Sequence, residues 1–411
     1  MEEKVKPFLA LHYSSPLLKN IGKLVCPPYD VITKKEEDFL RRKSSYNFSH
    51  ILLKGKNPSY QDLGKKFKEW LNKGVLVEEK EPSFYLSLQE FKMGTRLFRR
   101  LGFLGLLKLD EKAWVFPHER THFSPKKDRY QVIKYTQANL SPIFVVYPKR
   151  RNEPVSLIFK SLKNKEPFIK FKDKDVSYKL WKVSKKEEIA NIQKYFKNIP
   201  SLFIADGHHR FEVALSFFRR NRHRASLFKD LNYILAYFCP QDKNLLVLPT
   251  HRIIKKDIRE DFLLKSLSSY FNCQRLDSLK RLGERLEESK MFSFGFYRSG
   301  KIFYLSLKNN SLLSRVLPKF VKEYKNLDVF LLHNWVFKDI LNIDLEEDFL
   351  YSKDIKEATN LARKNRGCAF ILRAPDINTV MRLALRGEVL PQKTTYFYPK
   401  FLSGLILRKL W

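Results

Sequence analysis

A short apolar stretch, one polar turn and one amphipathic helical pattern constrain this chain more than any other local feature. Residues 202–205 are apolar, and Asp206-Gly207-His208-His209-Arg210 follows at once. Apolar side chains then recur from Phe211 to Phe218 at the spacing of one helical face. The pattern predicts a strand that turns at Gly207 into a helix.

The polar turn has the residue types of an anion site. The first N–H groups of a helix have no partner within the helix, and they attract negative charge. Gly207 allows a phosphate to approach the backbone, and Arg210 can bind two of its oxygens. His208 and His209 can donate to phosphate or move protons near neutral pH, and Asp206 can orient Mg²⁺ or a histidine. The alternative is that both histidines cap the helix and hydrogen-bond locally.

A second polar cluster spans residues 117–129. It contains two imidazoles, a carboxylate and several cations, which suit a metal ion or a phosphorylated ligand. Glu119 is a candidate general base, provided that a nearby charge keeps it ionised. His118 and Asp206 are the candidate metal ligands. The spacing is not that of a zinc protease helix, and a solvated polar loop is the alternative.

Three further segments place polar side chains beside proline, which fixes the local backbone. They are residues 26–30, 249–252 and 393–400. Asp30 in the first is a second candidate base. Arg252 and Lys393, together with Arg129, are candidate phosphate-binding cations.

Strand and helix patterns alternate without a strict βαβ order, which predicts a mixed α+β fold. The patterns indicate a helix at 61–73, a hairpin across 291–307 and a helix at 328–341. The chain is long enough for two domains, which we expect at 1–253 and 254–411.

Composition narrows the classes further. The 411 residues include 79 Lys and Arg against 44 Asp and Glu, a net charge of +35. Such a charge attracts phosphates or nucleic acid. No apolar run approaches the ~20 residues of a membrane helix, and early acidic residues argue against a signal peptide. The four cysteines form no CxxC pair, so we expect a reduced, cytoplasmic protein without a membrane partner. The basic pair Arg408-Lys409 is expected on the surface.

Six segments, in order along the chain, resemble the DUF1015 family of bacterial and archaeal proteins over nearly the full length. They are residues 26–32, 118–121 with 128–129, 141–144, 205–210, 249–252 and 393–400. Phe211 stands where the family usually has Tyr, and Thr394 where it usually has Ser. Neither difference removes a charge.

Residues 206–210 also resemble the phosphate-binding box of the ParB and sulfiredoxin superfamily, in which free-serine kinases have a very similar box. This resemblance implies a ParB/sulfiredoxin-like phosphate-binding core with large insertions, carried by residues 1–253. It also implies ATP, ADP or CTP as ligand, with Mg²⁺. Sulfiredoxins have Cys at the position of His208, so their chemistry is not expected here.

Three functions follow as hypotheses. The first is an enzyme that transfers or hydrolyses a phosphoryl group on a small, serine-related metabolite, with His209, Glu119 and Asp30 as catalytic residues. The second is a nucleotide-gated DNA-binding protein, which the positive charge favours. The third is a metal-dependent hydrolase built on His118, Glu119, His208 and His209.

Overall fold

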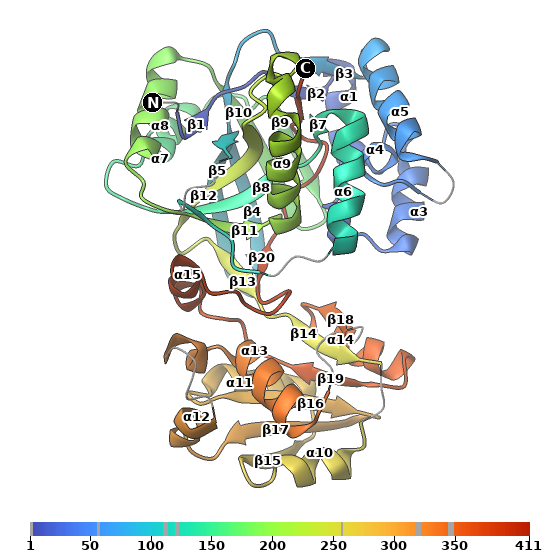
Figure 1. Cartoon of the computed structure of the whole chain (residues 1–411), viewed down its shortest axis with the longest axis vertical. Helices are drawn as coiled ribbons and strands as arrows, with labels where there is room; N and C mark the ends of the chain where they lie inside the picture. Colours follow the sequence, from blue (N-terminus) through green and yellow to red (C-terminus); the bar gives the residue numbers. More distant parts are fainter. Residues whose placement is uncertain are drawn as a thin grey trace. The chain divides into compact units, whose positions relative to one another are not determined.

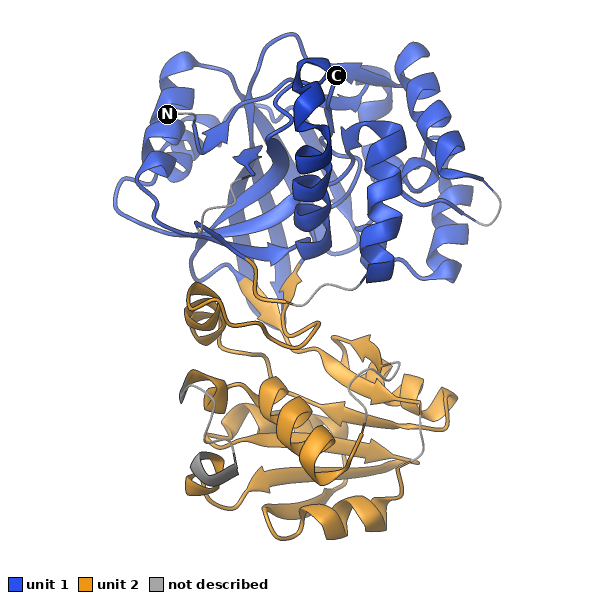
Figure 2. Cartoon of the chain, viewed as in Figure 1, with its two compact units in different colours: residues 1–116, 121–245, 399–411 blue, residues 117–120, 246–398 orange. Residues whose placement is uncertain are grey.

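The hydrophobic strands of the chain form one main sheet in each of two compact units (Figure 2). The computed structural model describes residues 3–55, 58–109, 114–119, 123–255, 258–316, 322–343 and 349–411. Unit 1 comprises residues 1–116, 121–245 and 399–411, and unit 2 comprises 117–120 and 246–398. The arrangement of strands and helices within each unit confirms a mixed α+β fold.

Unit 1 is built on a nine-stranded sheet in which β1 (Val5–Lys6) pairs with β5. The other strands follow in this order: β6 (Val115–Phe116), β11 (Leu202–Asp206), β8 (Ile143–Pro148), β12 (Tyr233–Gln241), β5 (Arg96–Lys108), β4 (Phe84–Met93), β10 (Val176–Val183) and β9 (Ile169–Asp173). β11 runs parallel to β6 and β12 parallel to β8, while the other pairs are antiparallel. The sheet is therefore mixed.

Helices cover this sheet through apolar stripes. α9 (His208–Asn221) lies beside α6 (Phe123–Thr136), and α6 beside α5 (Tyr60–Asn72), as Figure 1 shows. α7 (Pro154–Leu162) and α8 (Lys186–Lys197) form a second pair. In the core between helices and sheet, Phe103 stacks on Phe238 with ring centroids 4.7 Å apart, and Phe196 packs edge-on against both.

Unit 2 contains a six-stranded antiparallel sheet. Its strand order is β15 (Phe271–Leu276), β17 (Lys301–Leu307), β16 (Ser293–Arg298), β19 (Cys368–Ile371), β14 (His251–Ile254) and β18 (Phe349–Ser352). α11 (Leu279–Glu288) and α14 (Ile355–Lys364) pack their apolar stripes on one face. β13 (Leu246–Leu248) and β20 (Tyr396–Tyr398) form a separate two-stranded ribbon.

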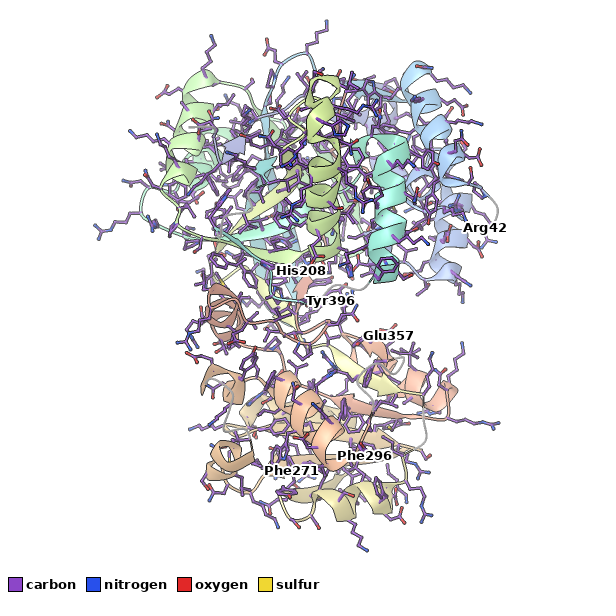
Figure 3. The ribbon with its side chains drawn as sticks, in the orientation of Figure 1. Arg42, His208, Phe271, Phe296, Glu357 and Tyr396 are labelled. Atoms are coloured by element: carbon purple, nitrogen blue, oxygen red, sulfur yellow. The ribbon has the colours of Figure 1, made fainter. Side chains whose placement is uncertain are left out.

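The second face of this sheet is aromatic. Phe271, at the start of β15 (Figure 3), packs against Trp335, and Phe370 packs against Phe337. Both partners lie on η4 (Leu332–Ile340), a π-helix that continues from the short α13 (Asp328–Leu331). The helix predicted at 328–341 is therefore present, but most of it has the wider π turn.

Other predicted local elements are present as well. α5 matches the helix predicted at 61–73, and β16 with β17 forms the predicted hairpin. No helix in the described part of the chain has the length and apolar character needed to cross a membrane.

The predicted division into 1–253 and 254–411 needs correction. The units separate between residues 245 and 246, because a cut at 253 would divide β14, which pairs along its length with β18. Residues 399–411 return to unit 1, where β21 (Arg408–Lys409) pairs with β7 (Ala138–Asn139).

Arg408 also differs from its predicted surface position, because only 3% of it is exposed. Its guanidinium donates at 2.6 Å to the carbonyl oxygens of Tyr233, Lys229 and Asp230. These buried hydrogen bonds connect the last strand to the segment that leads into β12.

We predict that Arg408→Ala lowers the free energy of unfolding by about 3 kcal/mol, because several buried carbonyls lose their donor. Urea unfolding followed by circular dichroism would measure the change. Arg222→Ala, at an exposed arginine, is the matched control and should stay within about 0.5 kcal/mol of the parent. Equal stability of the two variants would contradict this structural role of Arg408.

Candidate functional site

The predicted strand–turn–helix is present: β11 ends at Asp206, and α9 begins at His208 (Figure 3). Gly207 joins them in the left-handed region at φ 91°. A Cβ at this position would lie 3.0 Å from Ile143 Cγ2 and 3.0 Å from Arg210 Nη2. Both the backbone conformation and the lack of space therefore require glycine here.

The carboxylate of Asp206 lies between two cations of unit 1. Its Oδ2 accepts from Arg210 Nη2 at 2.6 Å, and its Oδ1 accepts from Lys400 Nζ. The three side chains are 10–12% exposed, so water screens them only weakly. Two positive charges share one negative charge at the start of α9.

Arg210 is more strongly engaged than the sequence suggested. Besides its bond to Asp206, its Nη1 donates to the carbonyl oxygen of Pro142. Its Nε is buried and has no hydrogen-bond partner among the described residues. Arg210 therefore braces the turn, and its predicted role as a phosphate clamp stays a prediction.

Two other predicted segments reach the same region of unit 1. Arg129 on α6 stacks its guanidinium over Tyr29 at 4.1 Å and donates to Leu52 O at 3.0 Å. Tyr29, Arg129, Ser141 and Arg210 line one cavity of about 50 Å³. Four of the predicted segments thus converge, although this cavity holds little more than one or two water molecules.

Neighbouring groups neutralise part of the charge around that cavity. Arg129 forms an ion pair with Asp128, which in turn accepts from Tyr60 Oη at 2.6 Å. Asp30, the predicted base in unit 1, lies exposed in a short 3-10 turn (Tyr29–Val31).

His118 and Glu119 belong to unit 2. The His118 ring is fully buried, and its Nε2 lies 3.0 Å from Thr395 Oγ1 and 3.6 Å from Glu119 Oε1. Thr395 N also donates to Glu119 Oε1 at 3.5 Å. His118 and Glu119 are therefore both bonded to Thr395, the residue directly before β20. Residues 120–122, which complete the predicted cluster, lie outside the described residues.

Arg252 is fully buried in unit 2 and donates to His333 Nε2 at 3.1 Å. It also donates to the carbonyl oxygens of Gln392 and Lys393, both at 3.1 Å, and of Thr250. Burial lowers the pKa of His333 well below its usual value, and the nearby Arg252 lowers it further. Lys393 has a positive φ of 55°, and its backbone carbonyl oxygen accepts the hydrogen bond from Arg252.

The predicted site residues thus fall into two sets. Unit 1 holds Asp30, Arg129 and residues 206–210, and unit 2 holds His118, Glu119, Arg252 and Lys393. That the two sets form one pocket stays a prediction. The two candidate metal ligands, His118 and Asp206, lie in different units. Within the described ranges no group of three or more His, Cys, Asp or Glu side chains could hold a metal ion. The metal-hydrolase hypothesis stays a prediction.

Sequence reasoning missed Lys400 as a site residue. It lies at the end of the segment 393–400, for which the proline beside polar side chains and the family resemblance were the available signals. Its partner Asp206 is 194 positions away, a pairing that only the fold reveals.

The chain belongs to the family described as protein of unknown function (DUF1015), whose model matches residues 5–330. Five of the six predicted segments lie within that range, and 393–400 lies beyond it. No curated protein matches the chain significantly.

Solved structures give weaker likenesses. A variant of free serine kinase in complex with ADP is 16% identical, covering 71% of this chain and 85% of that one, with a TM-score of 0.33. A conserved hypothetical protein from Pyrococcus furiosus is 16% identical, covering 72% and 92%, with a TM-score of 0.34. SbnI with a C-terminal truncation, from Staphylococcus aureus, is 8% identical, covering 73% and 85%, with a TM-score of 0.37. TM-scores this low carry no argument about the function of this chain.

We predict that Gly207→Ala lowers the free energy of unfolding by more than the strain of a positive φ alone would lower it. Gly300→Ala is the matched control, because Gly300 has φ 85° and open space where a Cβ would lie. The control should lose about 1 kcal/mol, and Gly207→Ala about 2–4 kcal/mol through added crowding against Ile143. Chemical unfolding of both variants gives the comparison, and equal losses would contradict the crowding.

A second prediction concerns acid stability. Burial, and then the nearby Arg252, lowers the pKa of His251 from 6.5 to about 4. The unfolded chain binds a proton at His251 more tightly than the folded chain does. The stability that the neutral His251 contributes is therefore fully present above pH 6.5 and is lost as the pH falls towards 4. His251→Gln should reduce the loss of unfolding free energy between pH 7 and 4 by up to about 3 kcal/mol.

Urea unfolding across this pH range measures the effect. His223→Gln, at an exposed histidine, is the control and should follow the parent. Identical pH profiles for both variants would show that His251 is not the group that titrates.

Proposed function

We propose that this protein binds a phosphate group of a nucleotide or small metabolite at the start of α9, and that it catalyses phosphoryl transfer or hydrolysis. The observation that carries the proposal is the set of charges around Gly207. Arg210 and Lys400 both donate to the carboxylate of Asp206, so two cationic side chains and one anionic side chain lie beside the first turn of the helix.

The α9 helix adds to the positive electrostatic potential at this turn. Its aligned peptide dipoles place roughly half a positive charge at the N-terminus, where the first backbone N–H groups have no partner within the helix. α9 runs from His208 to Asn221, long enough for this effect to develop. Because the flanking side chains are mostly buried, the potential is stronger than at an exposed helix end.

Within this arrangement we assign different tasks to the predicted residues. The backbone of Gly207 and His208 and the side chains of His209 and Lys400 receive the phosphate oxygens, and Arg210 keeps the turn in shape. His209, half-buried in the first helical turn, is also the candidate proton carrier. Asp30, in the same unit, remains the candidate base for the attacking hydroxyl group.

The proposed nucleotides are ATP, ADP and CTP, and serine is a candidate acceptor. A Mg²⁺ ion would bring charge compensation for the phosphates. Asp206 fits a Mg²⁺ ligand poorly, because both its oxygens already face cations. The ion would instead depend on phosphate oxygens and a second carboxylate such as Asp30.

Thermal unfolding with ATP, ADP, CTP, phosphoserine and serine, each with and without Mg²⁺, tests the proposal. A ligand at about 100 times its dissociation constant should add about 2.7 kcal/mol to the stability. His209→Ala should remove most of this gain, whereas the control His223→Ala, just beyond the C-terminal end of α9, should retain it. Lys400→Met should weaken binding too, because one of the cations at the turn is removed.

Two outcomes would contradict the proposal. One is the absence of any shift with these ligands. The other is a shift produced only by short duplex DNA and unchanged in His209→Ala, which would favour the nucleic-acid hypothesis. A nucleotide that passes this test is then used with serine in a phosphotransfer assay.

A further inference from the structure

Arg252 is a buried cation in unit 2 whose hydrogen-bond partners are all neutral. It is 0% exposed, and it donates to three backbone carbonyl oxygens and to His333 Nε2. His333 Nε2 accepts this hydrogen bond, and burial and then Arg252 lower the pKa of His333 well below its usual value. No carboxylate oxygen lies within 4.0 Å of the Arg252 guanidinium in the described part of the chain.

Such a charge is unusual, because buried cations normally have an anionic partner. The acidic side chain that acts on Arg252 electrostatically is Glu119, and this carboxylate is held by His118 and Thr395 instead. Of the five guanidinium N–H groups, four donate to the partners above. One N–H of Nη1 is left.

Arg252 lines a cavity of about 320 Å³ that lies entirely within unit 2. Thr250 lines it as well, and its Oγ1 is buried with no hydrogen-bond partner among the described residues. Thr250 is only 4% exposed. A buried hydroxyl without a partner costs free energy, so the cavity combines a cation that has no carboxylate hydrogen-bond partner with an unused donor.

The acidic residues of this cavity do not supply the missing partner. Asp328 forms a two-point ion pair with Arg373, at 2.5 Å from Nε and 3.1 Å from Nη2. Asp376 caps α15 (Ile377–Leu385) by accepting from Thr379 N at 3.0 Å and from Thr379 Oγ1 at 2.7 Å. Both carboxylates therefore have their donors, while Arg252 and Thr250 have no anion among the described residues.

We propose that this cavity is a binding site for the oxyanion group, phosphate or carboxylate, of a small metabolite. Arg252 supplies the charge and one N–H, and the hydroxyl of Thr250 donates the second hydrogen bond. The volume suits a ligand at the small end of the range that protein cavities accept. The site uses residues of unit 2 alone and does not depend on the function proposed for the α9 turn.

Isothermal titration of the full chain with inorganic phosphate, and separately with acetate, tests the proposal. Thr250→Val removes the hydroxyl while keeping the shape of the side chain, and it leaves the Thr250 carbonyl that Arg252 uses. Thr359→Val is the matched control, because Thr359 is a buried threonine on α14 that does not line the cavity.

The titrations are made in a His209→Ala background, so that phosphate bound at the α9 turn does not contribute. We expect one binding event there that is about 10-fold to 100-fold weaker with Thr250→Val added and unchanged with Thr359→Val added. Whichever anion binds more tightly identifies the group that the site prefers. No binding of either anion in the His209→Ala background would overturn the proposal, as would equal affinities with and without Thr250→Val.

Discussion

The contact between Asp206 and Lys400 determines where the last part of the chain runs. Pro399, the residue before Lys400, accepts a hydrogen bond at 2.5 Å from the buried Arg100 of β5. The chain is thus held from two sides as it re-enters unit 1, and Arg408 then fixes its end. The same carboxylate holds Arg210, so one anion links the return of the chain to the geometry of the α9 turn.

The positive charge of the chain is partly structural. Arg100, Arg252 and Arg408 are each at most 3% exposed and donate to backbone carbonyl oxygens. Arginine suits this task because its planar guanidinium carries five donors and is weakly hydrated. Such residues count towards the net charge of +35 but offer no surface to nucleic acid. The total charge does not say where the remaining cations gather, so a local arrangement such as that around Gly207 is more informative.

Local sequence patterns predicted the turn at Gly207, the hairpin and the helices α5 and α9, because periodicity and a glycine at a strand end are short-range signals. The division into units was harder to predict. Residues 117–120 belong to unit 2 although their sequence neighbours on both sides belong to unit 1, and residues 399–411 return to unit 1 after a long segment of unit 2. Long-range pairing decides both assignments. The candidate residues at 206–210 were found from their chemistry, whereas Lys400 and the state of Arg252 depend on partners far away in the sequence. The π-helical turns of η4 have no signal in a pattern of apolar spacing.

The spacing of Asp206 and Arg210 limits what the arginine of this box can contribute to binding. Gly207 turns the chain so that Asp206, the last residue of β11, faces Arg210 in the first turn of α9. The two side chains form an ion pair before any ligand arrives. A phosphate would have to compete with Asp206 for the guanidinium, and only the difference between the two interactions would count as affinity. The first backbone N–H groups of a helix, in contrast, have no partner within the helix and attract an anion directly. The ion pair therefore gives Arg210 the task of preserving the turn. In the function proposed above, the backbone of the turn and the neighbouring side chains would make the contact with phosphate.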